Sequence, residues 1–255
     1  MRAAVVALAR RALVNSVRRP QFLAPLVVFP TLFLAINVGG LGATRSLAGF
    51  PHVDGFLDYQ LAAAITQSLL LGGVSAGIAM ALDIEGGFFD RLVASPTPRA
   101  ALVLGRVLAA SVIAAFQVLY FVVLGYVFGA TIQGGVLGLL CVLAIGVVAG
   151  TGFGALGVLL ALRSRSASTV QGIFPLVFVV LFISSAFFPL ELLTSPTDVV
   201  AQYNPLSFIA NGMRQPIAFS NELAPFLEGL LAAAGVAVAA VWLSILALRG
   251  RLRDA

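Results

Sequence analysis

Long apolar segments alternate with short polar segments along almost the whole chain. A helix that crosses the hydrocarbon core of a bilayer needs about 20 apolar residues. Pro25 and Pro30 in the first such segment are tolerated, because neighbouring helices can bond the carbonyl groups that a proline leaves free. The pattern predicts an all-α polytopic membrane protein with one transmembrane domain over 1–255. Its six predicted transmembrane helices, spans one to six, are 22–41, 57–82, 100–128, 135–162, 170–190 and 225–248.

Residues 1–20 predict an amphipathic helix that lies on the membrane surface. Such a helix suits the headgroup layer, where arginine meets anionic lipid. The alternative is an anchor that only obeys the positive-inside rule and has no further role. The basic residues of this interfacial helix are Arg10, Arg11, Arg18 and Arg19; helical spacing places Arg11, Asn15, Arg18 and Arg19 on one face and Val5, Val6, Leu13 and Val17 on the other.

The polar segment 83–99, DIEGGFFDRLVASPTPR, separates spans two and three. Gly86 and Gly87 are expected to end span two, and residues 88–94 to form a short helix that the following Ser-Pro pair stops. Exposed phenylalanines beside an Asp-Arg pair predict a knob for a socket on another protein, because aromatic residues and arginine are favoured at interfaces. The alternative is a surface hairpin that merely turns the chain.

The longest polar segment, 191–224, lies between spans five and six and is too long for a simple hairpin. It contains apolar stretches such as PLSFIANGM, which predict one or two short outer helices that re-enter the membrane or cap the bundle. Asn204 followed by Pro205 is typical of a helix start, with asparagine as the N-cap and proline in the first turn.

The arginine positions predict the orientation of the chain. With the N-terminus inside, Arg45 and Arg214 are the only basic residues on the outer side, where acids such as Asp54, Asp58 and Glu191 collect. The positive-inside rule therefore places both termini in the cytoplasm. Every one of the 15 basic residues is arginine, which together with the alanine and glycine content indicates a GC-rich prokaryotic genome. We expect a multi-pass protein of a prokaryotic cytoplasmic (inner) membrane.

Composition excludes several classes of function. The chain is 60% hydrophobic and only 10% charged, which excludes a soluble protein. A P-loop needs a lysine to reach the nucleotide phosphates, so a chain without lysine has no conventional ATP site of its own. The net charge of +5 does not indicate a nucleic-acid partner, because the arginines flank apolar spans.

No residues form a candidate catalytic or metal-binding set, and the chain is not predicted to be an enzyme. His52 is the only histidine, and a zinc site needs three or four protein ligands. The G-x-G-x-x-G pattern at 152–157 lies inside span four rather than between a strand and a helix. Gly146, Gly150 and Gly154 are better explained as a ridge of small residues against a neighbouring helix.

Polar residues inside the spans are candidates for a substrate path. They are expected to face other helices or a cavity rather than lipid; hydrogen bonding between helices is the alternative role. No span carries an ionised side chain away from its ends, which disfavours proton- or sodium-coupled transport. The path candidates are Asn37, Gln60, Gln67, Ser68, Gln117, Gln171, Ser184 and Ser185.

The six-span layout, EGGFFDRLVASPTPR at 85–99 and NPLSFIANGMRQ at 204–215 resemble the membrane subunit of type-2 ABC exporters, particularly the daunorubicin-resistance permease group. The first motif is fairly specific, and the second is looser. The short loop between spans three and four departs from the family, because it leaves little room for an outer domain. The family motif is matched by Glu85, Gly87, Phe89, Asp90, Arg91, Ser95 and Pro96.

The resemblance implies a homo- or heterodimer of permease subunits above two cytoplasmic P-loop ATPase subunits. ATP and Mg would bind the ATPases, and this chain would hold no cofactor. The interfacial helix would add a second ATPase contact, and spans one, two and five would line the path. The ATPase-coupling residues would be Glu85, Gly86, Gly87, Phe88, Phe89, Asp90, Arg91, Leu92, Ser95 and Pro96, and the outer gate would include Phe188, Pro189, Asn204, Pro205 and Arg214.

The resemblance thus implies the permease subunit of an ATP-driven exporter for a hydrophobic or amphipathic drug, lipid or natural product. Multidrug efflux and antibiotic resistance follow as expected roles, and membrane lipid is a further expected partner. Export of polysaccharide or glycolipid by the same architecture is one alternative. A non-transporting membrane scaffold, a secondary carrier and a channel are the others.

Overall fold

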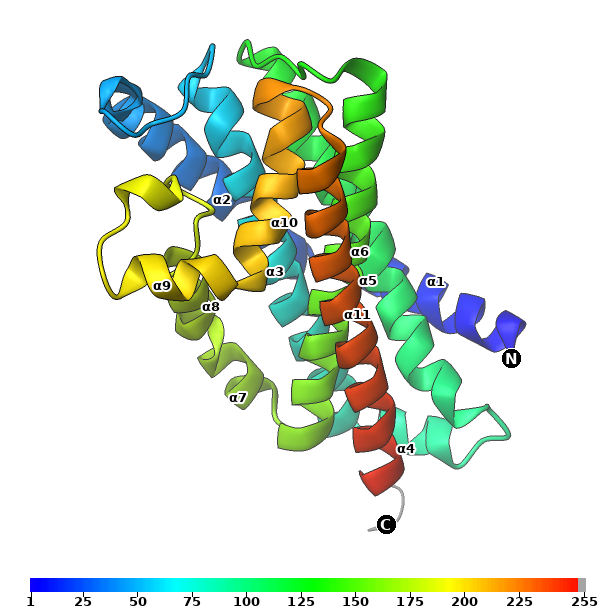
Figure 1. Cartoon of the computed structure of the whole chain (residues 1–255). Helices are drawn as coiled ribbons and strands as arrows, with labels where there is room; N and C mark the ends of the chain where they lie inside the picture. Colours follow the sequence, from blue (N-terminus) through cyan, green and yellow to red (C-terminus); the bar gives the residue numbers. More distant parts are fainter. Residues whose placement is uncertain (252–255) are drawn as a thin grey trace.

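The computed structural model describes residues 1–251, which are helical without a strand in that range. The helices form one bundle, with α4 and the end of α11 at the same end of the molecule (Figure 1). The α-helices are α1 (Arg2–Arg18), α2 (Pro20–Leu41), α3 (Phe56–Glu85), α4 (Phe88–Val93), α5 (Arg99–Val127), α6 (Gly135–Ser164), α7 (Ala167–Gly172), α8 (Phe174–Phe182), α9 (Thr197–Tyr203), α10 (Pro205–Arg214) and α11 (Leu223–Arg251).

Within residues 1–251, 5 helices are long and apolar enough to cross a membrane. They are α2 with the 3₁₀ turn that follows it (Gly42–Ser46), α3, α5, α6 and α11. Their positions coincide with predicted spans one, two, three, four and six. The long apolar runs therefore place these helices correctly, because such runs form helices that bond their own backbone groups.

The continuous helix predicted over 170–190 is wrong. The structure has instead the short helices α7 and α8, which together cover Ala167–Phe182. Pro175 sits in the first turn of α8 and has no N–H to bond the carbonyl four residues earlier, so the helix is interrupted at Ile173. Residues 183–189 are not helical and lead into the outer segment.

The outer segment contains the two short helices that the sequence predicts, α9 and α10. Asn204 is the N-cap of α10, and its side-chain oxygen accepts a hydrogen bond from the Leu206 N–H at 3.0 Å. Pro205 occupies the first turn, as expected. A π-helical turn at Gln215–Phe219 follows and leads toward α11.

Helix α6 lies at the centre of the bundle and packs against α3, α5 and α11 (Figure 1). A Cβ atom added at Gly146, Gly150 or Gly154 would overlap a side chain of α5. At Gly150 the overlap is with Ala114. The predicted ridge of small residues is thereby confirmed as the contact that brings α5 and α6 together.

Helix α1 crosses the bundle and packs against α5 (Figure 1). A Cβ added at Gly105 of α5 would lie 2.7 Å from the Leu8 Cβ, so the glycine permits this close crossing. The predicted orientation of α1 is wrong for Arg11, which points into the bundle, whereas Val6 and Val17 are exposed. The face of α1 that carries the small residues Ala9 and Ala12 packs against the bundle. Arg11 lies beside this face and bonds Asp83 of α3.

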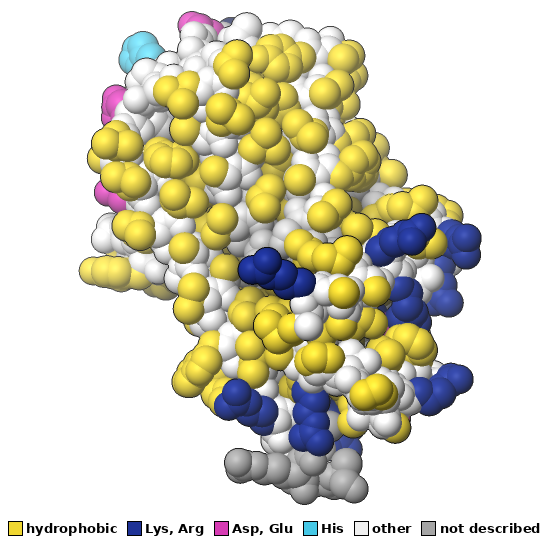
Figure 2. All heavy atoms as spheres, turned by 90° about the vertical axis from the view of Figure 1, so that its right-hand side faces the viewer, with side chains coloured by type: hydrophobic (Ala, Val, Ile, Leu, Met, Phe, Trp, Pro, Cys, Tyr) yellow, Lys and Arg dark blue, Asp and Glu magenta, His cyan; other side chains and the backbone are white. Residues whose placement is uncertain are grey.

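Charged side chains are distributed unevenly along the molecule. Figure 2 shows basic side chains gathered over one end of the visible face and acidic side chains near the other, with apolar surface between them. The positive-inside rule predicts this separation for a chain whose basic end faces the cytoplasm. The cytoplasmic position of both termini stays a prediction.

Replacement of Gly150 by leucine should prevent tight packing of α5 on α6. The added side chain must displace Ala114, and such overpacking typically destabilises a core by about 1–3 kcal/mol. We expect a lower thermal midpoint and less monodisperse protein in size-exclusion chromatography. Gly235→Leu is the matched control, because a Cβ at Gly235 meets nothing within 4 Å. A Gly150→Leu variant as stable as this control would contradict the packing role.

Candidate functional site

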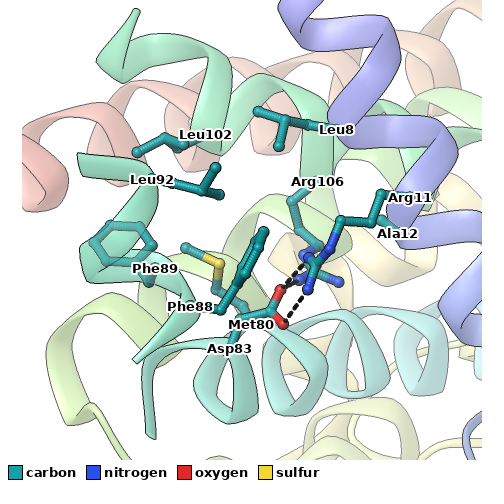
Figure 3. Close-up of a pocket in the computed structure, with 10 residues that line it drawn as sticks. All are labelled: Leu8, Arg11, Ala12, Met80, Asp83, Phe88, Phe89, Leu92, Leu102 and Arg106. Atoms are coloured by element: carbon teal, nitrogen blue, oxygen red, sulfur yellow. Dashed lines mark hydrogen bonds and ion pairs between the residues drawn. The ribbon is translucent and has the colours of Figure 1, made fainter. Parts of the chain in front are cut away.

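Three charged side chains meet where α1, α3 and α5 approach α4 (Figure 3). The Asp83 carboxylate near the end of α3 pairs with Arg11 of α1 at 3.1 Å and also with Arg106 of α5. Arg106 is the most deeply placed, with 10% of its side chain exposed. One carboxylate therefore joins two guanidinium groups and ties three helices together.

Asp83 and Arg106 were not among the site residues that the sequence predicts. Arg106 lies inside predicted span three, and Asp83 lies directly after predicted span two. Both look like ordinary charges at the ends of spans. The available signal was their position, since an acid and an arginine at the same end of adjacent spans lie at the same depth and can pair.

The aromatic residues of the segment 83–99 face the chain itself, and the prediction of an exposed aromatic knob is wrong. Phe89 is only 3% exposed and belongs to an apolar cluster that includes Met80 and Leu102. Phe88 is half-buried, and the Arg11 guanidinium lies 3.4 Å from its ring centroid. The two rings are buried because α4 folds back on the ends of α3 and α5, where apolar area is removed from water.

The backbone of this segment follows the sequence prediction closely. Gly86 follows the last residue of α3, and Gly87 adopts the left-handed conformation (φ 67°), which glycine accepts without strain and which turns the chain into α4. The Ser95 hydroxyl donates to the Leu92 carbonyl at 2.7 Å and closes the last turn. Pro96 follows and is exposed.

The polar residues of the segment bond two distant helices. Glu85 accepts a hydrogen bond from the Ala167 N–H at 2.8 Å, which links the end of α3 to the start of α7. Asp90 pairs with Arg251 of α11 at 3.3 Å, and the Arg251 guanidinium lies 4.5 Å from the Phe89 ring centroid. Arg91 is exposed and, within the described part of the chain, bonds only the Gly87 carbonyl of its own segment. The exposed face of α4 is therefore polar.

The remaining arginines of the interfacial helix stay at the surface. Arg10, Arg18 and Arg19 are exposed, in agreement with a helix in the headgroup layer, whereas Arg11 is drawn inward by Asp83.

A groove of about 840 Å³ lies between α2, α3, α7 and α8. Its wall is mostly apolar, with Phe22, Pro25 and Leu26 of α2 among its residues. Gln171 is the one residue of the predicted path that lines it. Ser75, a polar residue of predicted span two, also lines the groove, and the polar residues that sequence reasoning missed here are Gln21 and Ser168.

Most predicted path residues instead bond other parts of the chain. The Gln117 amide donates to the Ser68 carbonyl at 2.7 Å, and the Ser68 hydroxyl donates to the Leu26 carbonyl at 2.6 Å. Asn37 bonds a carbonyl of its own helix. Gln67 is fully buried, and neither polar atom of its amide has a partner among the described residues. Hydrogen bonding within and between helices accounts for Gln117, Ser68 and Asn37 in this structure.

The predicted outer-gate residues gather around the non-helical segment 183–189. Pro189 is buried, and Phe188 packs against the main apolar core. The Asn204 amide donates to the carbonyls of Val180 and Ile183 at 3.0 and 3.3 Å. The Ser185 N–H donates in turn to the Ser207 hydroxyl. The end of α8 is therefore fastened to α10 by side chains.

Arg214 is the most constrained charged residue of this outer region. It is 4% exposed, and its guanidinium lies 3.9 Å from the Tyr59 ring centroid. Burial lowers the pKa of the Arg214 guanidinium from its ordinary value, and Tyr59 opposes this shift. A guanidinium nevertheless stays charged in proteins, so a positive charge is fixed here.

Comparison with known proteins identifies one family. The family described as ABC-2 type transporter matches residues 3–218. The match contains both the Asp83 cluster and Arg214. A comparison with curated proteins found no match.

Replacement of Asp83 by asparagine should destabilise the junction of α1, α3 and α5. It leaves Arg11 and Arg106 side by side without their carboxylate, and because the cluster is partly buried we expect a cost of about 1–3 kcal/mol. We expect a clear drop in the thermal midpoint in detergent. Glu222→Gln is the matched control, because Glu222 is exposed. Equal midpoints for the two variants would show that Asp83 does not hold the helices.

Proposed function

Because the chain belongs to the ABC-2 type transporter family, and is thus a multi-pass permease component of an ABC transporter that associates with an ABC ATPase, we propose that it exports a hydrophobic or amphipathic substrate. The proposed energy source is ATP, bound with Mg by two separate ATPase subunits. The proposed membrane is a prokaryotic inner membrane, and the proposed assembly contains a second permease subunit. The chain itself supplies the path and no catalytic group.

The observation that carries this proposal is the attachment of α4 to the rest of the chain. Phe89 anchors α4 in the apolar cluster, Asp90 pairs with Arg251 of α11, and Glu85 links the end of α3 to α7. Gly87 fixes the turn that joins α4 to α3. A partner that moves α4 therefore moves these helices together, which is the property that an ATPase-coupling helix needs.

The groove supports the proposed class of substrate. It lies between α2, α3 and α7–α8, which are the helices that the family resemblance assigns to the path. Its apolar wall suits an acyl or aromatic body, and the amides and hydroxyls of Gln21, Ser75 and Gln171 suit a neutral polar group. A drug, a lipid and a natural product all fit this description, and multidrug efflux as in the daunorubicin-resistance group is one form of it.

The same polar residues favour a second candidate, the export of a glycolipid or polysaccharide. Sugar hydroxyls pair well with amide and hydroxyl groups, which line part of the groove. A membrane scaffold is less well supported, since it has no use for a groove of this size.

Charge reversal at Arg91 should weaken ATPase binding without disturbing the fold. Arg91 is exposed and, among residues 1–251, bonds only the Gly87 carbonyl just before α4, so Arg91→Glu changes the surface offered to the partner and little else. We expect at least tenfold less ATPase to copurify with the chain in mild detergent. Arg45→Glu is the matched control, because Arg45 is exposed on the predicted outer side.

Recovery of the unaltered chain without any ATPase would refute the proposed function. Full recovery of ATPase with Arg91→Glu would refute only the assignment of the exposed face of α4 as the contact.

Removal of the Glu85 carboxylate should lower the amount of substrate exported per ATP hydrolysed. Glu85→Ala removes the acceptor for the Ala167 N–H, so that α3 can move without α7. Glu85→Gln is the matched control, because a glutamine side-chain oxygen also accepts from an N–H. We expect a severalfold lower ratio for alanine and a nearly unchanged ratio for glutamine, measured in proteoliposomes with the ATPase. Equal ratios for both variants would contradict a coupling role of this bond.

A further inference from the structure

The end of α8 leaves backbone carbonyls without helical partners in the apolar interior. Helix ends always free such groups, and in a membrane each one needs another donor. Here the donors are side chains of Gln60, Asn204 and Arg214, which belong to or flank helices distant in the sequence. The carbonyls that they bond are those of Val180, Ile183, Ser185, Ala186 and Phe187.

Arg214 joins two separate segments through this network. Its guanidinium donates to the Ser185 carbonyl at 3.3 Å and to the Ala186 carbonyl, both after α8. It also donates to the Tyr59 carbonyl of α3 at 3.2 Å and to the Asn211 side chain of its own helix. Within residues 1–251 no carboxylate forms an ion pair with it. Carbonyl dipoles and the Tyr59 ring therefore offset the loss of hydration.

The two segments that Arg214 joins are also linked at the opposite end of the bundle. Tyr59 lies near the start of α3, and the same helix ends at Glu85. Glu85 accepts from Ala167, the first residue of α7, which leads through α8 to Ser185. Helix α3 has 30 residues, so it spans about 45 Å at its rise per residue. Helices α3 and α7–α8 thus form a frame closed by Glu85 at one end and by Arg214 at the other.

A second pocket makes the Arg214 end of the frame accessible. It has a volume of about 430 Å³, and Tyr59, Ser185, Asn211 and Arg214 all contribute to its wall. The large groove opens between α3 and α7–α8 toward the other end. Arg214 therefore lines a pocket near one end of this pair of helices, and the large groove lies farther along the same pair.

We propose that Arg214 is the lock of the outer gate. Its guanidinium holds α3 to the segment after α8 in the closed state, and the gate opens when the carbonyls of Ser185 and Ala186 leave it. The proposal rests on the proposed transport function, since a gate requires a path. Arg214 acts as a positioning residue through backbone carbonyls. Its planar group with several donors suits this task, whereas a lysine offers a single charged point.

Thiol labelling from outside measures the state of this lock. Ser185 is 1% exposed and lines the outer pocket, so Ser185→Cys in a Cys141→Ala background provides a reporter. The probe is a membrane-impermeant maleimide added to the outer face of proteoliposomes. We expect slow labelling with Arg214 present, at least tenfold faster labelling with Arg214→Ala, and an intermediate rate with Arg214→Lys.

Adding free guanidinium ion to the Arg214→Ala protein tests whether the guanidinium group itself keeps the gate closed or whether Arg214 only stabilises the fold. Millimolar guanidinium chloride should slow labelling of the Arg214→Ala protein toward the original rate, because the ion can occupy the same group of carbonyls. An equal concentration of sodium chloride is the control. The exposed Arg45→Ala variant should show the original labelling rate. Unchanged labelling with Arg214→Ala, or no protection by guanidinium, would overturn the proposal.

A second measurement keeps Arg214 in place, in case the alanine variant does not fold. The reporter protein is reconstituted with its ATPase and labelled with and without ATP. We expect labelling to become severalfold faster during ATP hydrolysis. Hydrolysis without any change in labelling would overturn the lock while leaving the proposed function intact. If no ATPase binds, the proposed function fails, and the comparison of Arg214 with Arg214→Lys still tests whether the guanidinium closes the segment.

Discussion

The requirement that every backbone carbonyl in an apolar interior find a donor governs the outer half of this structure. Helix α8 stops at Phe182, and the carbonyls beyond it would be unpaired if the neighbouring helices carried only apolar side chains. Gln60 from α3, together with Asn204 and Arg214 at the two ends of α10, supplies the missing hydrogen bonds. These side chains replace the backbone N–H donors that a continuing helix would supply. Their hydrogen bonds therefore set the positions of α3, α8 and α10 relative to one another.

Ion pairs perform the corresponding task at the other end of the bundle, where α4 lies. Asp83 holds α1 and α5 through two arginines, and Asp90 holds α11 through Arg251. These pairs keep the short helix α4 against the bundle, with its aromatic side buried and its polar side exposed. The buried side of α4 thus fastens this short helix to the bundle, and its exposed side is available for contact with another protein.

Hydropathy predicted the long helices well, because their apolar runs depend on composition alone. Local chemistry predicted the cap at Asn204 and the turn at Gly87. The wrong predictions concern the surroundings of a side chain, which composition does not reveal. Phe89 was expected at the surface because it lies in a polar segment. The sequence of such a segment does not reveal whether the phenylalanine packs against another protein or against its own chain. The break after Phe182 was missed because the isoleucine, phenylalanines and leucine beyond it keep the mean hydropathy high despite two serines. Arg214 was expected at the outer gate from the family resemblance alone, since only the fold shows the carbonyls around it.

The frame formed by α3 and α7–α8 is exposed to solvent at its Glu85 end and buried at its Arg214 end. Glu85 is exposed, so water can compete for its bond to Ala167. Arg214 is buried, where low dielectric strengthens each hydrogen bond and no solvent is at hand to replace one that breaks. The two junctions therefore differ in how readily water can replace their hydrogen bonds. Separation of α3 from the segment after α8 therefore meets its greater resistance at the Arg214 junction, which lies at the opposite end of this pair of helices from α4.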